Sequence, residues 1–168
     1  MPDAPANIHR PKWDVELGDP ARLRAARLGA YAGASGLGAT LYEVDPGGAV
    51  SPYHLHHANE ELLVVLSGRP TLRTPEGARE LDPGAVVAFP AGPEGAHRIS
   101  NASDEAVRVL VCSTMRMPEV AEHLDTGTWL AMTGPGEGKV FPAGSDVPVM
   151  EAMGRAMRAA REHDDAGD

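Results

Sequence analysis

Closely spaced glycine and proline residues cut this chain into short apolar segments, and that division is what most restricts its fold. Between residues 36 and 115, turn sequences such as Pro75-Glu76-Gly77 and Asp82-Pro83-Gly84 recur at short intervals. Segments of about four to eight residues suit β strands, whereas helices need longer stretches. Many short strands with regular turns predict an all-β barrel or sandwich. We expect strands at Leu37–Val44, Val50–His57, Glu61–Ser67, Thr71–Thr74, Ala78–Leu81, Ala85–Phe89, Ala96–Asn101 and Val107–Thr114.

The length of 168 residues suits one domain with short extensions. Residues 1–19 predict an N-terminal arm, because they show little periodicity, and Trp13 is its one aromatic anchor. Residues 20–125 are assigned to the β domain. In Pro20–Gly29, the Asp19-Pro20 pair is compatible with a helix start. The glycine-rich sequence that follows favours short strands, and we expect strand there.

The C-terminal part has a different pattern. Thr126–Gly144 is rich in glycine and proline and predicts a loop. Met150, Met153 and Met157 then recur at helical spacing within Val147–Arg161. Residues 126–161 are therefore assigned to a loop and a helix, whose methionine face we expect to cover the barrel or a partner subunit. The last residues, 162–168, predict a disordered tail.

Charge and hydropathy narrow the range of partners. The chain carries 15 basic and 24 acidic side chains, a formal charge of −9. This balance argues against nucleic acid, whose phosphates select for Lys and Arg, and against anionic membrane surfaces. No stretch of about 18 apolar residues is present to span a bilayer. The polar, proline-rich start of the chain has no apolar signal region, so we expect a cytoplasmic protein.

Two histidines and an acid predict a metal site. His54 and His56 are two residues apart on a predicted strand, so their side chains share one face. The next strand starts almost at once with Glu61, and we expect it to be the antiparallel neighbour, with Glu61 facing the two imidazoles. Two His and one carboxylate with open positions suit a reactive divalent metal. Leu62–Leu66 is continuously apolar, which predicts a strand buried on both faces, where Glu61 needs a partner. Glu60 is the alternative ligand, because alternation does not fix register across a turn.

Other residues are candidates for the same site. His97 opens a strand after a Gly/Pro-rich turn and is interpreted as the fourth ligand. His57 is expected to face outward, opposite His56. Tyr42 and Tyr53 are each compatible with the pocket or with a sheet edge. No role is assigned to three histidines in predicted arm, loop and tail segments: His9, His123 and His163.

Two stretches together resemble the two motifs of the cupin superfamily. The first motif matches at every spacing through Gly48, His54, His56, Glu61 and Gly68. The second matches through Gly84, Pro90, Gly92, His97 and Asn101, with four residues instead of two between Gly92 and His97. The resemblance covers about residues 36–115 and is closest to small bacterial single-domain cupins of unassigned activity. It implies a jelly-roll (double-stranded β-helix) barrel, usually a homodimer, with one divalent iron, manganese, nickel, zinc or copper ion held by His54, His56, Glu61 and His97.

The predicted ligand set leaves two functions open. The open coordination positions favour a metal-dependent oxygenase or isomerase acting on a small oxygen-bearing molecule. The alternative is a non-catalytic module that binds or senses a small metabolite, because no general base, nucleophile or phosphate loop is evident outside the ligand set. The sequence slightly favours the enzyme.

Overall fold

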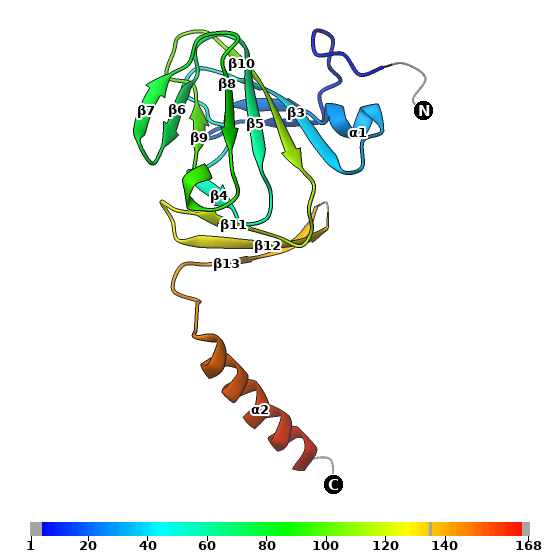
Figure 1. The fold of residues 1–168 in the computed structure, drawn as a ribbon, viewed down its shortest axis with the longest axis vertical. Helices are drawn as coiled ribbons and strands as arrows, with labels where there is room; N and C mark the ends of the chain where they lie inside the picture. Colours follow the sequence, from blue (N-terminus) through cyan, green and yellow to red (C-terminus); the bar gives the residue numbers. More distant parts are fainter. Residues whose placement is uncertain (1–4, 135, 166–168) are drawn as a thin grey trace.

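Antiparallel strands dominate the secondary structure of the computed structural model, which describes residues 5–134 and 136–165 (Figure 1). The described residues also form two helices and a 3-10 turn: α1 (Leu28–Ala32), α2 (Val149–Asp165) and η1 (Pro93–Gly95). The strands are β1 (Val15–Leu17), β2 (Leu23–Ala26), β3 (Leu37–Val44), β4 (His54–His56), β5 (Glu61–Ser67), β6 (Thr71–Thr74), β7 (Gly77–Glu80), β8 (Val86–Phe89), β9 (Arg98–Ser100), β10 (Val107–Thr114), β11 (Glu119–His123), β12 (Thr128–Gly134) and β13 (Glu137–Phe141).

The predicted strands are present, and four of them, β3, β5, β6 and β10, have the predicted bounds. The segment Val50–His57 differs most, because only His54–His56 is a regular strand. Residues 50–53 bend instead. Pro52 has no N–H to contribute to a strand ladder, which explains the late start of β4.

The strands form two layers that enclose one core (Figure 1). One layer is a six-stranded sheet of order β1-β2-β3-β10-β5-β8. The other contains the sheets β13-β12-β11-β4 and β7-β6-β9, which meet at an isolated antiparallel bridge between His54 and His97. Side chains from both layers fill the space between them: Leu63, Val65, Leu72, Leu81, Phe89, Ile99, Val109 and Val111. The all-β cupin fold with a C-terminal helix is therefore confirmed.

Two motif glycines are required by close approaches of the backbone. A Cβ added at Gly48 would lie 2.5 Å from the carbonyl oxygen of Ala21. Gly68 has a φ of +73°, and a Cβ there would lie 2.7 Å from Val107. Larger residues would push the turns before β4 and after β5 apart. These glycines therefore allow the tight packing of the two turns.

The outer face of the six-stranded sheet is only partly covered, which corrects the expectation that β5 is buried on both faces. Leu63 and Val65 face the core and are fully buried, but Leu62 on the opposite face is 39% exposed. The continuous apolar run hides an ordinary alternation between an inner and an outer face. Its outer side chains are half-buried or exposed because neighbouring segments cover only part of that face.

The N-terminal arm provides that partial cover. Ile8 and Trp13 pack against a small cluster formed by Leu28 and Leu41 on the outer side of the sheet. The Arg24 guanidinium lies 4.4 Å from the centre of the Trp13 ring. Within the predicted arm, β1 also pairs with β2, so strand is correct for Leu23–Ala26 and the short helix α1 follows it.

The segment after residue 125 differs from the sequence prediction. Residues 126–144 were expected to be a loop, but β12 and β13 pair antiparallel and continue the sheet that contains β4 and β11. The glycines and prolines made the whole segment resemble a loop, although Thr128–Gly134 has a strand-like apolar content. The sheet therefore extends past the predicted domain end.

Helix α2 stands away from the β strands (Figure 1). It begins at Val149 and continues to Asp165, four residues beyond the predicted end at 161. Its expected packing against the barrel is not observed, since Met150 is 77% exposed and Met157 is 68% exposed. The rest of the predicted disordered tail, residues 166–168, lies outside the described residues. Among the described residues, no helix is both long and apolar enough to cross a bilayer.

Candidate metal centre

The four predicted ligand side chains line a single cavity between the two layers. The cavity measures about 210 Å³. Its lining is Tyr42, Val50, Ser51, His54, His56, Glu61, His97, Ile99 and Val111. Glu60, the alternative to Glu61, is exposed and does not line it. The geometry thus places the preferred acid, and not its neighbour, beside the imidazoles.

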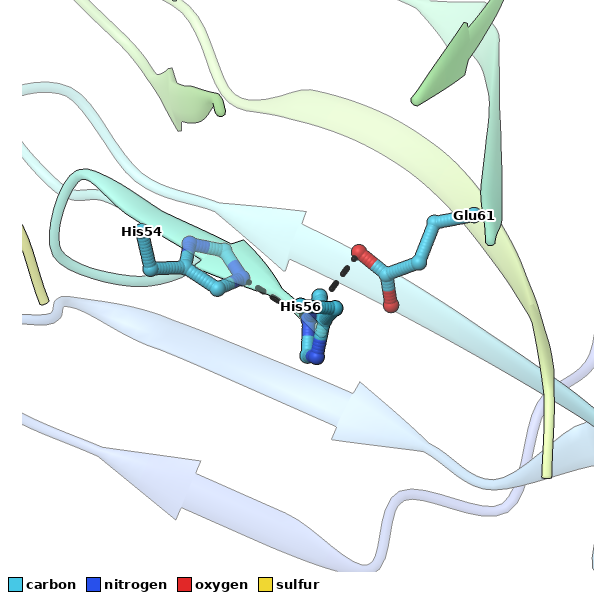
Figure 2. Close-up of side chains that lie close together, drawn as sticks. All are labelled: His54, His56 and Glu61. Atoms are coloured by element: carbon cyan, nitrogen blue, oxygen red, sulfur yellow. Dashed lines mark hydrogen bonds and ion pairs between the residues drawn. The ribbon is translucent and has the colours of Figure 1, made fainter. Parts of the chain in front are cut away.

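Glu61 faces the histidines from the opposite layer, and the prediction that its strand is the antiparallel neighbour of the histidine strand is wrong. Strand β5 is not the hydrogen-bonded neighbour of β4; it pairs with β10 and β8 in the opposite layer. Strand β4 pairs instead with β11. The short connection between His56 and Glu61 therefore crosses from one layer to the other. Glu61 faces the imidazoles across the interior of the barrel (Figure 2).

The Nε2 atoms of His56 and His97 lie beside the Glu61 carboxylate, and that of His54 lies beside His56. His54 Nε2 lies 3.1 Å from His56 Nε2. Glu61 Oε2 lies 3.5 Å from His56 Nε2 and 3.2 Å from His97 Nε2. The donor atoms of His54, His56 and Glu61 all lie within 4.8 Å of one another, and His97 joins them through Glu61. Three potential ligands thus form one compact cluster, and His97 adjoins it beside Glu61.

The opposite ring nitrogens fix which atoms face the cavity. His54 Nδ1 lies 3.0 Å from the Pro52 carbonyl, and His97 Nδ1 lies 2.9 Å from the Gly95 carbonyl. A carbonyl oxygen only accepts, so each Nδ1 carries the proton when it bonds its carbonyl; His54 Nδ1 also lies 3.1 Å from the Ser51 hydroxyl. In a neutral imidazole the other nitrogen, Nε2, then has a free lone pair. The two carbonyls therefore favour the tautomer in which Nε2 can bind a metal.

Burial keeps His54 neutral. Desolvation, together with the nearby charges of His97 and His56, lowers the pKa of His54 to about 4. Burial alone would raise the pKa of Glu61, but the His97 hydrogen bond and the neighbouring histidine charges outweigh it and lower the pKa below its usual value. At neutral pH the site therefore contains a neutral imidazole at His54 and an ionised carboxylate at Glu61.

The spacing of the donor atoms fits a metal ion. The lone pair of His54 Nε2 lies 3.1 Å from His56 Nε2, so a proton on His56 or a shared cation can occupy the space between them. For metal–nitrogen distances of about 2.05 Å, two ligand atoms of one ion lie about 2.9–3.4 Å apart. Those spacings are close to the three measured here. The donor set of imidazole nitrogen and carboxylate oxygen suits several first-row divalent ions.

Other residues singled out in the sequence take different places. Tyr42 lines the cavity, whereas Tyr53 is buried elsewhere, with the Arg73 guanidinium 4.0 Å from its ring centre. The outward position predicted for His57 is confirmed, since its ring stacks on Trp129 outside the cavity.

Two residues on β11 were missed by the sequence analysis. His123, placed in a loop and given no role, pairs with His54, so the two side chains share a face with ring centres 6.3 Å apart. Glu119, on the same face of β11, is buried, and its Oε1 lies 3.6 Å from His56 Nδ1. The alternation Glu119-Val-Ala-Glu-His123 was the available signal, because residues 119, 121 and 123 of a strand point the same way.

Comparisons with known proteins agree with this geometry. A family model described as a cupin domain matches residues 40–113, a range that contains all four candidate ligands. No curated protein matches the chain.

Solved structures of bacterial proteins share the fold. A sugar phosphate isomerase of the cupin superfamily from Silicibacter pomeroyi is 25% identical, with a TM-score of 0.73, and the match covers 87% of this chain and 98% of that one. A candidate sugar phosphate isomerase from Acidithiobacillus ferrooxidans is 30% identical, with a TM-score of 0.70, covering 82% and 86%. A polyketide cyclase from Streptomyces resistomycificus is 24% identical, with a TM-score of 0.56, covering 69% and 82%, and it shows the fold alone.

The fold and site define a small β-barrel protein with a cluster of potential metal ligands inside the barrel. This chain belongs to the cupin superfamily, as a protein with a single matched cupin domain.

Proposed function

We propose that His54, His56, Glu61 and His97 bind one divalent iron, manganese, nickel, zinc or copper ion, and that the protein uses it to isomerise a small hydroxy-carbonyl compound. The observation that carries the proposal is the cluster of Nε2 atoms around Glu61: those of His56 and His97 lie 3.5 Å and 3.2 Å from Glu61 Oε2, and that of His54 lies 3.1 Å from His56 Nε2. Bound there, the ion would polarise a carbonyl oxygen and stabilise negative charge that develops on that oxygen.

The cavity walls would orient and shield such a ligand. Burial, followed by the negative charge of Glu61, raises the pKa of Tyr42, so its hydroxyl stays protonated and can donate a hydrogen bond to a ligand oxygen. Val50, Ile99 and Val111 supply an apolar wall that limits access of water.

The similar structures support isomerisation rather than oxygenation. Two of them, at 25% and 30% identity, are described as sugar phosphate isomerases. The cavity lining contains no Lys or Arg. A phosphate group would therefore lie outside the cavity, and only the hydroxy-carbonyl end of such a substrate would reach the candidate ligands.

A non-catalytic metabolite-binding module is the alternative. Beyond the four candidate ligands, only Tyr42 and Ser51 among the lining residues can exchange a proton with a bound molecule. A protein that holds a chelating metabolite without converting it needs nothing more than the metal and this lining. Turnover separates the two functions.

Metal analysis of protein purified without an affinity tag tests the proposal. We expect about one first-row divalent ion per chain in the wild type and little in His54→Ala. An absence of bound metal, after incubation with each of the five ions and gel filtration, would refute the metal site. The loaded protein is then assayed by NMR with small aldoses, ketoses and their phosphates. Interconversion supports the isomerase, and saturable binding without conversion supports the alternative.

We also propose that the protein is a homodimer, on separate observations. The apolar residues Met150, Met153 and Met157 of α2 are exposed, as are Leu62 and Val86 on the sheet. Exposed apolar surface of this kind is typical of interaction sites, and a helix of this length is only marginally stable by itself in water. Light scattering after size exclusion is the test, and a monomer at micromolar concentration would contradict the dimer.

A further inference from the structure

Glu119 is a buried carboxylate that the cupin motifs do not include. It comes from β11, outside the range matched by the cupin family model. Its side chain is 1% exposed. A buried ionised carboxylate requires several hydrogen bonds or an opposite charge, because desolvation is costly. The contacts of Glu119 therefore indicate what it does.

Those contacts hold the connection between two candidate ligands. Glu119 Oε1 accepts from the backbone N–H of His57 at 3.1 Å and of Ala58 at 3.4 Å, and Oε2 accepts from the side-chain amide of Asn59. These three residues immediately follow His56 and precede Glu61 by at most four positions. Glu119 thus anchors the short crossing that takes the chain from β4 to β5.

Asn59 extends the anchor to β10. Its side-chain oxygen accepts from the backbone N–H of Arg116 at 2.7 Å and from the Thr114 hydroxyl at 3.1 Å. Thr114 is also bound by Glu60, whose backbone N–H lies 3.1 Å from the hydroxyl. The whole connection between His56 and Glu61 is therefore fixed by polar groups that lie outside the ligand set.

Glu119 also faces a buried histidine nitrogen that has no hydrogen-bond partner. His56 Nδ1 is buried without a hydrogen-bond partner, in contrast to the Nδ1 atoms of His54 and His97. Glu119 Oε1 lies 3.6 Å from it. A shift of roughly 0.5 Å would bring the pair to hydrogen-bond distance. Glu119 is thus placed to accept a hydrogen bond from His56 Nδ1, as the backbone carbonyls of Pro52 and Gly95 do from the other two rings.

Carboxylates flank His56 on both sides. Glu61 lies on the Nε2 side of the ring and Glu119 on the Nδ1 side, 3.5 Å and 3.6 Å away. A carboxylate beside Nδ1 favours the tautomer that leaves Nε2 free to bind a metal.

We propose that Glu119 is a positioning residue for the metal centre, which orients His56 through its Nδ1 proton and fixes the crossing from His56 to Glu61. The inference rests on the proposed metal site. Outer-sphere partners of metal-binding histidines typically contribute about 10–100-fold in metal affinity. Glu119 therefore affects the site although it does not contact the ion.

The test compares Glu119→Gln with a control variant of matched burial, Asn101→Ala. Asn101 is 2% exposed and bonds the backbone of Val44 and Glu105, away from the imidazoles. Zn²⁺ affinity is measured by competition with a chelator, and the visible spectrum of the Co²⁺ form reports ligand geometry. We expect Glu119→Gln to weaken Zn²⁺ binding by about 10–100-fold and to change the Co²⁺ spectrum. Asn101→Ala should lower stability and leave both unchanged.

Three results decide the matter. A Zn²⁺ affinity of Glu119→Gln within about twofold of the wild type, with an unchanged Co²⁺ spectrum, would overturn the proposal. If Glu119→Gln does not fold, Glu119→Asp replaces it. This variant keeps the charge and moves the carboxylate away from His56, and the same affinity loss is expected.

If the wild type binds no metal, the proposed function is wrong, but the role of Glu119 at His56 can still be tested. In that case the tautomer of His56 is measured by ¹⁵N NMR in the metal-free wild type and variant. If the variant loses the preference for the Nδ1–H form, the positioning role of Glu119 is supported. If the preference is unchanged, that role is overturned.

Discussion

The ligand pocket and the C-terminal extension of this protein differ in how far their side chains are buried and hydrogen-bonded. In the pocket, His54 and His97 are at most 8% exposed and each ring has a partner for its outer nitrogen. In the extension, the apolar residues of α2 are mostly exposed, and the helix stands apart from the barrel. Burial and hydrogen bonding thus fix the pocket within one chain, whereas the helix presents an apolar surface that the described residues leave uncovered.

The largest effect is expected on Zn²⁺ affinity, and it should distinguish a proposed ligand, His56, from its neighbour His123. His56→Ala removes a proposed ligand and should weaken Zn²⁺ binding by about 100-fold or more, since one of four metal ligands is lost. His123→Ala removes the neighbouring imidazole on β11 and should change the affinity by less than about twofold. Calorimetric titration of both variants with Zn²⁺ checks this. Equal losses in the two variants would place His123 among the ligands.

The second effect is a pH dependence of the metal-free protein. The pKa of His54 is about 4 when folded and 6.5 in its ordinary state. The unfolded chain therefore binds more protons between these values, and the free energy of unfolding should fall as pH decreases from 6.5 towards 4. The lowered pKa of Glu61 acts in the same direction at lower pH. At about 1.4 kcal/mol per pKa unit, the His54 contribution is about 3 kcal/mol.

Urea unfolding of the metal-free protein at a series of pH values measures this slope, and His54→Asn provides the comparison. The variant should have a flatter profile between pH 6.5 and 4. The same slope in both proteins would show that His54 is not the group responsible.

The third effect concerns the arm, which packs on the barrel as α2 does not. Trp13→Ala should lower the free energy of unfolding by about 2 kcal/mol, because it removes a partly buried aromatic ring and its contact with Arg24. Lys12→Ala, at an exposed neighbouring position, should change it by less than about 0.5 kcal/mol. Chemical denaturation of both variants is the measurement. A Trp13→Ala value as small as that of Lys12→Ala would mean that the arm does not stabilise the sheet.

The smallest effect is expected from removal of α2. A chain that ends at Gly144 should keep its Zn²⁺ affinity within about twofold, because the helix buries little against the barrel of its own chain. Its mass in solution should fall to that of a monomer. A loss of metal binding on truncation would mean that the helix supports the pocket of its own or a partner chain. An unchanged dimer mass would place the subunit contact elsewhere.

Much of this protein was determined by its local sequence. The bounds of β3 and β5 follow from alternating or continuous apolar runs between glycine and proline turns, which are local signals. His54 and His56 share a face because strands have a period of two. Local signals failed between residues 126 and 144, where glycines near a hairpin turn hid two strands, and at β5, whose apolar run concealed an exposed face.

Only the tertiary structure decided how the site is assembled. Glu61 meets the imidazoles from the opposite layer, and Glu119 meets His56 from a strand 63 residues farther along the chain, so neither contact follows from spacing in the sequence. Such contacts depend on which strands pair and which layers face each other, and these are properties of the whole fold. The sequence determined which side chains are available and which way they point along a strand, because backbone geometry is local; the packing of the two layers decided which of them meet.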